Sequence, residues 1–453
     1  MLKRAQTKTE EKNYPKVLLY ASSPRNFRSS LIEYLYEISQ IYPIVLLSEE
    51  LDPETRKILG DKKLFPKLKE IIPVNQYAKR KMNLLARHRY FCKLAKKIIE
   101  NYRPDIVIAN GSNIFESYLR RFARNINAIS LRFTEFLPGY AKQPAKEYIL
   151  RIAYLKTPDF LPLPIKILFS KARTYLGHFL VYWILPLLTG QKPFLGEPSA
   201  ILIADPHRFK GIDYFIVSSE RDYNILLRQG LPAEKIYISA HPLNKESKVR
   251  RFFRENNFSN SLNGDKMGKK ILTIMWPPEQ IGFKRTDYSL IPKKELWEDR
   301  IKTTSLIAGT LKEWKIIIKP HPLAENVVEI AHYFKSIYNN IEVKNPTDFA
   351  DRYIEISDVI AGLSPASNVL LNAFLQRPDN IILSLDFQQE FGGDYYKDFE
   401  GIEYINDRKK LINVLELIRE KKYQKRTETK RELIGFPNTI GLLKHLLNQK
   451  SKF

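Results

Sequence analysis

Cysteine is almost absent from this chain of 453 residues, and Cys92 is its only example. A single thiol excludes a disulfide framework and a metal site built on cysteines, and it fits a reducing compartment. The sequence also lacks a G-x-G-x-x-G dinucleotide loop, a complete P-loop and a D-x-D metal motif. We therefore expect no resident cofactor and no bound metal.

Acidic residues and long apolar runs are scarce as well. Lys and Arg number 74 against 50 Asp and Glu, a formal net charge of +24. Such an excess predicts an anionic partner: nucleic acid, an acidic membrane surface or a phosphorylated substrate. The apolar run at 179–188 is shorter than the ~20 residues needed to span a bilayer. The first residues lack the apolar core of a signal peptide, and we expect 1–13 to be a disordered polar tail.

Short apolar runs alternate with helical patterns along most of the chain, which predicts parallel βαβ units and an α/β fold with two Rossmann-like domains. The alternation breaks at a polar stretch before residue 270 and then restarts. We expect five segments: the tail, an N-terminal acceptor domain at 14–255, a linker at 256–269, a C-terminal nucleotide-donor domain at 270–430, and a helix at 431–453 that packs back on the N-terminal domain.

Two strands of the second half, 316–318 and 359–360, each end in a polar turn. One turn carries Lys319 and His321, and the other carries Ser364, Ser367 and Asn368 before an apolar helix. Ligands of open parallel sheets bind at the carboxyl ends of strands, and a helix start offers free N–H groups to phosphate. We expect neighbouring turns that bind a diphosphate-linked donor, with Trp276 and Glu279 after the strand at 270–275. Taken singly, a Pro-His-Pro turn and Ser or Asn caps are also ordinary structural features.

Polar residues also follow strands of the first half, where they could line a cleft. Glu135 stands just past the strand at 128–133, where it could act as a general base or hold a loop by hydrogen bonds. Each of the other candidates could equally be structural; they are Ser22, Arg25, Asn110, Ser112, His207 and His241.

Two segments fit an anionic membrane surface. Residues 79–100 form an amphipathic helix whose polar face is basic, with no acidic residue from 79 to 99. It is either a core helix with a solvated face or a face held against lipid headgroups. Residues 158–194 are apolar and rich in proline, with nearby cations, and are either a monotopic attachment or a buried hairpin of helices. His88 is expected to be a packed side chain.

Three stretches resemble the GT-B glycosyltransferase superfamily, in particular bacterial capsule and teichoic-acid-type transferases. They are K-P-H-P at 319–322, S-D-V-I-A-G-L-S-P-A-S-N-V-L-L-N-A at 357–373, and the D-Y-F-I-V-S to S-A-H-P region at 213–241. The resemblance implies two domains facing each other across a cleft and a donor phosphate site at Lys319, His321, Ser364, Ser367 and Asn368. Two positions depart from that group: Asn372 replaces the usual acid for the donor ribose, and Thr134-Glu135 replaces a His-Gly pair.

The resemblance predicts a metal-independent, inverting glycosyltransferase with Glu135 as the base. The enzyme would move a sugar from a nucleotide-activated donor to a lipid-linked or cell-surface glycan acceptor, in the cytoplasm and peripherally on the inner face of the cell membrane. Alternatives on the same fold are transfer of a polyol phosphate from a cytidine diphosphate donor and epimerisation of a nucleotide sugar. Alternatives of another class are a basic nucleic-acid-binding protein, against which no DNA or RNA module is recognisable, and an inactive scaffold.

Overall fold

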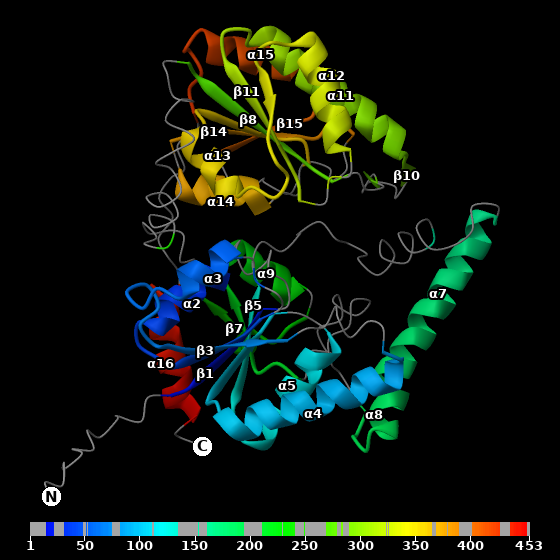
Figure 1. Ribbon diagram of the computed structural model, residues 1–453, viewed down its shortest axis with the longest axis vertical. Helices are drawn as coiled ribbons and strands as arrows, with labels where there is room; N and C mark the ends of the chain where they lie inside the picture. The colour runs from blue at the N-terminus through cyan, green and yellow to red at the C-terminus, as the bar shows by residue number, and fades with distance from the viewer. Residues whose placement is uncertain are drawn as a thin grey trace, which may run out of the picture.

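The computed structural model describes most of the chain. The described residues are 15–21, 31–48, 51, 53–74, 82–110, 113–134, 153, 161–193, 211–228, 230–240, 249, 269–278, 282–283, 290–322, 324, 326–364, 368–377, 379–388, 401–425 and 435–450. They form two parallel sheets with helices on both faces of each, one in each half of the chain (Figure 1). The expected α/β fold with two Rossmann-like domains is confirmed.

The first sheet has seven parallel strands in the order β3-β2-β1-β4-β5-β6-β7. In chain order, they are β1 (Val17–Ala21), β2 (Ile44–Ser48), β3 (Leu68–Pro73), β4 (Ile106–Ala109), β5 (Ile129–Thr134), β6 (Tyr214–Val217) and β7 (Ile236–Ile238). The central strands β1 and β4 are buried along their whole length, as apolar runs between two helical layers should be.

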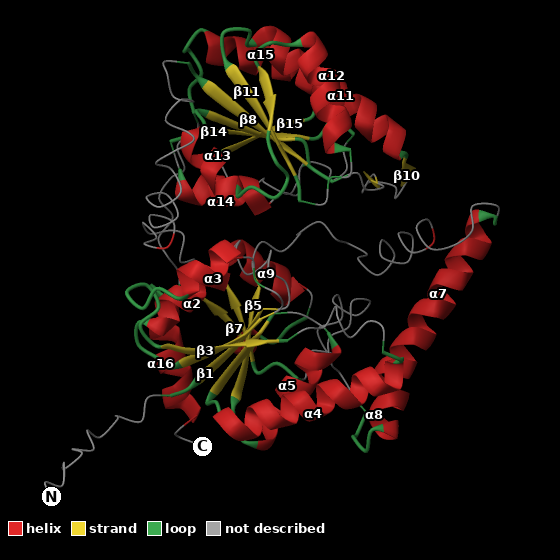
Figure 2. Ribbon diagram, in the orientation of Figure 1, coloured by secondary structure: helices red, strands yellow, loops and turns green. Residues whose placement is uncertain are grey.

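Helices cover both faces of this sheet (Figure 2). One face packs against α2 (Ile32–Ser39), α3 (Pro53–Leu59) and the C-terminal helix α16 (Thr439–Lys450). The other face packs against α4 (Leu84–Tyr102) and α5 (Ile114–Asn125). The remaining elements are α7 (Leu163–Phe179), a π-helix (Leu180–Ile184), α8 (Leu185–Leu188), α9 (Glu220–Arg228) and a 3-10 turn (Ala233–Lys235). Three leucines of α16 are buried in the core of this first sheet: Leu442, Leu443 and Leu446.

The second sheet has six parallel strands in the order β12-β11-β8-β13-β14-β15. They are β8 (Ile271–Trp276), β11 (Lys315–Pro320), β12 (Ile341–Val343), β13 (Val359–Gly362), β14 (Ile381–Leu385) and β15 (Ile402–Ile405). Its helices are α11 (Lys293–Thr310), α12 (Val327–Ile337), α13 (Ala350–Ile356), α14 (Asn368–Gln376) and α15 (Arg408–Arg419), and a small hairpin joins β9 (Gly282–Phe283) to β10 (Leu290–Ile291).

Aspartates fasten neighbouring strands together at the amino-terminal edges of both sheets. Asp105, Asp213 and Asp358 each stand directly before a strand. Each carboxylate accepts a hydrogen bond from a main-chain N–H at the start of an adjacent strand: from Lys16 to Asp105 at 2.8 Å, from Ser130 to Asp213 at 2.7 Å, and from Ile271 to Asp358 at 2.9 Å. These bonds satisfy edge N–H groups that the ladder leaves unpaired, and they leave the carboxyl-terminal edges for other groups.

Candidate functional site

The carboxyl-terminal edge of the second sheet is organised around the end of β8. β11 and β13 pair with β8 on its two sides, with Pro320 opposite Trp276 and Gly362 opposite Met275. The ladder continues into both turns, because the His321 N–H donates to the Trp276 carbonyl at 2.8 Å and the Leu363 N–H donates to the Met275 carbonyl at 3.2 Å. The Lys-His turn and the Ser-containing turn therefore begin within one residue of each other along β8.

These two turns do not lie on neighbouring strands as expected, because β8 runs between β11 and β13. Strands in a sheet are spaced about 4.8 Å apart, so the two main chains are separated by about 10 Å. This is a correction to the expectation of adjacent turns. An anion contacted from both sides must therefore lie across the end of β8, and an extended group such as a diphosphate suits this span better than a single phosphate.

Lys319 lies beneath its turn and is only 3% exposed. Its ammonium group donates hydrogen bonds to the Pro320 carbonyl at 2.6 Å and to the Pro346 carbonyl, in the connection after β12, at 3.0 Å. Burial lowers the pKa of Lys319 to about 8, and the nearby Asp348 carboxylate opposes that effect in part. Lys319 thus holds two loops of the edge together and adds a buried positive charge below them.

A second buried cation supports the turn after β8. Arg300 of α11 is 6% exposed, and its Nη1 lies 3.4 Å from the Pro278 carbonyl. Arg300 was not predicted as a site residue, because its position in a helix gives no signal that it reaches a strand end. Two positive charges beneath adjacent turns favour the binding of an anion at this edge. Within the described ranges, no three His, Cys, Asp or Glu side chains are grouped so as to hold a metal ion.

The third part of the edge is the connection from β13 to α14. Gly362 ends β13, and a Cβ there would lie 2.7 Å from Leu370 Cδ1, so the absence of a side chain lets α14 pack closely against the strand. Ser364 is half-buried at the start of this connection. Ser367 and the side chain of Asn368 lie outside the described residues, although the main chain of Asn368 opens α14.

Trp276 does not line the edge as expected from its place after the strand. Its side chain is 1% exposed and packs in the core, with its ring centroid 5.6 Å from that of Trp297 and 6.3 Å from that of Phe334. The alternation of side chains along β8 directs it to the face covered by α11 and α12. Only its main chain contributes to the edge. Asn372, in place of the usual acid, is a buried residue of α14.

In the first domain, Asn110 is the only predicted site residue within the described part of the chain. It follows β4, and its Oδ1 accepts a hydrogen bond from the Phe133 N–H of β5 at 3.0 Å. Asn110 therefore joins two strand ends, which is a structural role. The other six candidates lie outside the described residues: Ser22, Arg25, Ser112, Glu135, His207 and His241. Glu279 of the second domain also lies outside the described residues.

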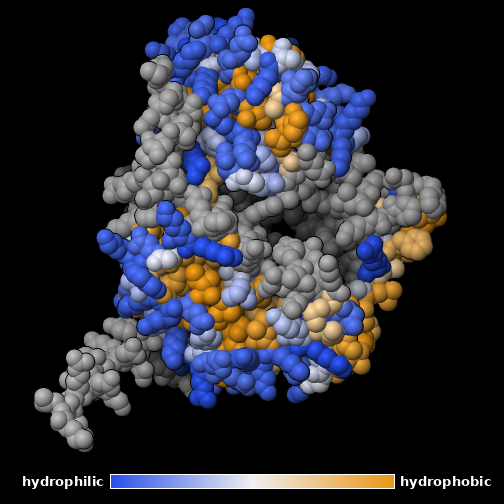
Figure 3. Space-filling model, in the orientation of Figure 1, coloured by the Kyte–Doolittle hydropathy of each residue, from blue (hydrophilic) through white to orange (hydrophobic). Residues whose placement is uncertain are grey.

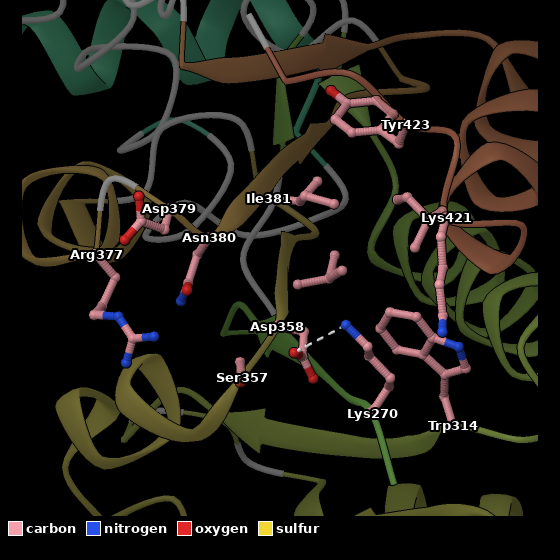
Figure 4. Close-up of a pocket in the computed structure, with 12 residues that line it drawn as sticks. Lys270, Trp314, Ser357, Asp358, Arg377, Asp379, Asn380, Ile381, Lys421 and Tyr423 are labelled. Carbon is pink, nitrogen blue, oxygen red and sulfur yellow. Dashed lines mark hydrogen bonds and ion pairs between the residues drawn. The ribbon is translucent and has the colours of Figure 1, made fainter. Parts of the chain in front are cut away.

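A pocket of about 310 Å³ opens at the opposite, amino-terminal edge of the second sheet (Figure 4). Its polar lining includes Lys270, Asp358, Arg377 and Lys421. Lys270 Nζ pairs with Asp358 at 3.4 Å, and the Asp358 carboxylate also holds the Ile271 N–H. The Arg377 guanidinium pairs with Glu355 at 3.1 Å, so Lys270, Asp358 and Arg377 are all engaged in ion pairs or in hydrogen bonds to the sheet.

Solved structures with a similar fold include UDP-GlcNAc 2-epimerases and a glycosyltransferase. The chain is similar to UDP-GlcNAc 2-epimerase from Methanocaldococcus jannaschii, with a TM-score of 0.59, 12% identity and coverage of 96% of this chain and 99% of that one. The enzyme from Neisseria meningitidis bound to UDP-GlcNAc matches with a TM-score of 0.54, 12% identity and coverage of 96% and 100%. A glycosyltransferase from Rickettsia africae gives a TM-score of 0.51, 12% identity and coverage of 97% and 98%.

No protein-family model and no curated protein matches the sequence. The similarity to solved structures extends over nearly the whole chain at low identity, and it is a similarity of fold. The chain therefore has the two-domain, GT-B-like Rossmann fold of these epimerases and of the glycosyltransferase.

Proposed function

We propose that the chain is a glycosyltransferase that moves a sugar from a nucleotide-activated donor to a lipid-linked or glycan acceptor. The observation that carries this proposal is the edge formed by β11, β8 and β13. Two turns rise on either side of β8 above the buried cations Lys319 and Arg300. Main-chain N–H groups and fixed positive charge in such a setting stabilise a diphosphate, both when it binds and when it leaves.

The proposed step is a single displacement that needs no metal ion. The acceptor oxygen forms a bond to the sugar's anomeric carbon, and the bond from that carbon to the phosphate oxygen breaks. The electron pair passes to the nucleotide diphosphate at the β8 edge, near His321 and Ser364, and the acceptor's proton passes to a base. Glu135, the residue after the end of β5, is the proposed base; the side chains of Ser367 and Asn368 are proposed to add to the phosphate site.

A second candidate is epimerisation of a nucleotide sugar. It is favoured by the full-length similarity to UDP-GlcNAc 2-epimerases, one of them bound to UDP-GlcNAc. An epimerase uses the same diphosphate site but needs no acceptor. Transfer of a polyol phosphate from a cytidine diphosphate donor would also use that site. These candidates differ in which nucleotide binds and in whether product formation requires an acceptor.

Nucleotide binding tests the site. Thermal unfolding would be followed with UDP, CDP, CMP and GDP for the wild type, His321→Ala and Ser364→Ala, with His332→Ala on the exposed face of α12 as the control. A ligand at 100 times its Kd stabilises by about 2.7 kcal/mol, which raises Tm by several degrees. Loss of a hydrogen bond to a charged phosphate costs about 1.5–3 kcal/mol, so affinity should fall at least about tenfold in the two site variants and remain unchanged in the control.

The donor that binds is then incubated with and without a lipid-linked acceptor. Release of the nucleotide diphosphate only when the acceptor is present supports transfer. Formation of the sugar's epimer without an acceptor supports the epimerase, and binding of CDP alone supports the polyol phosphate reaction. If no nucleotide raises Tm, the site is not a donor site, and the nucleic-acid-binding and scaffold alternatives take precedence.

A further inference from the structure

Exposed apolar side chains are concentrated on one helical arm of the first domain. We define this arm as α7, the π-helix and α8, which follow one another without interruption from Leu163 to Leu188. Of the fifteen large hydrophobic side chains that are exposed among the described residues, ten belong to the arm: Ile165, Leu168, Phe169, Tyr175, Leu176, Phe179, Leu180, Trp183, Leu187 and Leu188. The alternative that this segment is a buried helical hairpin is therefore wrong.

The ten side chains form one stripe. Their positions recur at intervals of three and four residues, which places them along a single face of a helix. Ala172 lies on the same face and is also exposed. Its sequence neighbours Lys171 and Arg173 are exposed too, and each is rotated by about 100° from it, to opposite sides. The apolar stripe thus has a cation on each border, and the sequence has no acidic residue from 160 to 196.

The root of the arm is fixed to the body of the first domain. Tyr182 is buried among residues of α4 and α5, and Thr189 Oγ1 lies 3.3 Å from the Tyr118 hydroxyl of α5. Arg121 of α5 donates to the Pro193 carbonyl at 2.9 Å. From this root α7 extends away from the sheet and its covering helices (Figure 1). The stripe is consequently held out rather than folded back onto the core.

Helix α4 lies beside the root and presents positive charge. It packs against α8, and its outward face exposes Arg89, Lys93, Lys96 and Lys97. Asn83 begins the helix by accepting a hydrogen bond from the Ala86 N–H at 2.8 Å. Figure 3 shows hydrophilic side chains along the lower edge, over α4, and hydrophobic side chains at the right, over the arm. An apolar stripe bordered by cations and continued by a basic face matches a surface with a negative outer layer and an apolar interior.

We propose that this arm inserts its apolar stripe into the interface of an anionic lipid bilayer, while Lys171, Arg173 and the basic face of α4 contact the headgroups. Trp183 and Tyr175 belong to the residue types that favour this boundary. The arm lies in the interface and does not cross it, since no helix among the described residues is both long and apolar enough to span a membrane. A second copy of the chain is a poorer occupant, because a two-fold contact would bring the cations of the stripe together without acidic partners.

Vesicle binding tests the proposal with the full-length chain. Vesicles of phosphatidylcholine alone, or with 30% phosphatidylglycerol as the probe (about one lipid in three), are mixed with the wild type, with Leu168→Glu/Leu176→Glu, and with Val328→Glu/Ile337→Glu. The last variant places the same charges on exposed apolar positions of α12 in the second domain, where the exposed fractions are 84% and 54% against 66% for both leucines of the arm. Co-sedimentation gives the bound fraction. The chain holds four tryptophans, so the difference in tryptophan fluorescence between the wild type and Trp183→Phe reports entry of Trp183 into the interface.

The wild type and the α12 variant should bind the anionic vesicles. The arm variant should bind at least about tenfold more weakly, because a loss of about 1.4 kcal/mol in binding free energy lowers the affinity tenfold. Lys93→Gln/Lys97→Gln should weaken binding about fivefold for each cation removed. Equal binding by the wild type and the arm variant, or no binding by either, would overturn the proposal. So would a wild-type dimer in sedimentation velocity that the arm variant dissociates, because the stripe would then be a protein interface.

Nucleotide binding by the arm variant separates this inference from the proposed function. The substituted leucines lie on the exposed face of the arm, whereas the nucleotide site is proposed at the carboxyl-terminal edge of the second sheet. The arm variant should therefore keep the nucleotide-dependent rise in Tm while losing vesicle binding. If vesicles bind but nucleotides do not, the membrane contact stands and the sugar chemistry fails.

Discussion

Replacing Lys319 by Met should remove a pH-dependent part of the stability of the second domain. Lys319 is 3% exposed, and its ammonium group donates hydrogen bonds to the Pro320 and Pro346 carbonyls. Burial lowers its pKa from 10.5 to about 8. Methionine has a similar length and no charge, so it fills the same space and cannot titrate.

The size of the effect follows from the two pKa values. Their difference corresponds to about 3 kcal/mol. Between pH 8 and pH 10.5 the unfolded chain binds this proton and the folded chain does not. The free energy of unfolding therefore increases as pH rises through this window, because the buried amine loses its charge. This contribution of Lys319 is lost again as pH falls through 8. The free energy of unfolding of the wild type, minus that of Lys319→Met, should rise by about 3 kcal/mol from pH 7.5 to pH 10.5.

Urea unfolding at closely spaced pH values would measure this difference. Subtracting the variant removes the contribution of tyrosines that titrate in the same range. Lys335→Met, at an exposed position of α12, is the control. A flat difference for Lys319→Met would refute the reasoning, because it would mean that the ammonium remains hydrated. Proton uptake when a nucleotide binds at pH 9 would further show that Lys319 responds to the phosphates.

Two other substitutions test the first domain. Burial lowers the pKa of His88 to about 4, so the free energy of unfolding of the wild type should fall by up to about 3 kcal/mol as pH falls from 6.5 to 4. His88→Leu should flatten this pH dependence in urea unfolding. Parallel pH dependences for the wild type and the variant would contradict the prediction. Gly435 has a φ of +127°, and a Cβ there would lie 2.5 Å from the Ile238 carbonyl oxygen. Gly435→Ala should therefore destabilise the chain by at least about 2 kcal/mol in thermal unfolding. Gly177→Ala, inside α7 with open space around it, should instead stabilise the chain by up to about 1 kcal/mol. A Gly435→Ala Tm equal to that of the wild type would show that the Ile238 carbonyl moves aside.

The strands of both sheets were predictable where they are buried on both sides. A fully buried strand such as β8 or β11 reads as a continuous apolar run, and its polar turn marks where it ends. β3 was not predicted, because it is an edge strand with sequence L-K-E-I-I-P and exposed lysine and glutamate side chains. Its strand character comes from pairing with β2, which a local pattern does not contain.

The candidate site was predictable in residue type but not in arrangement. The K-P-H-P turn and the Ser-containing turn were found because strand ends carry polar residues. That β8 separates them depends on the strand order, which is set by long-range packing. The partners of Lys319 lie in its own turn and in a connection 27 residues away. Arg300 reaches the turn after β8 from the middle of a helix, so only the packing of α11 reveals it.

The arm bears on the choice between the two proposed reactions. An epimerase has one water-soluble substrate and gains nothing from a membrane surface. A transferase with a lipid-linked acceptor must meet a soluble donor and a membrane-bound acceptor together. The arm and the basic face of α4 belong to the first domain, and the edge with Lys319 and Arg300 belongs to the second. If the arm binds anionic vesicles and the edge binds a nucleotide diphosphate, this division of the two contacts between domains favours transfer. If the arm does not bind vesicles, epimerisation becomes the favoured reaction.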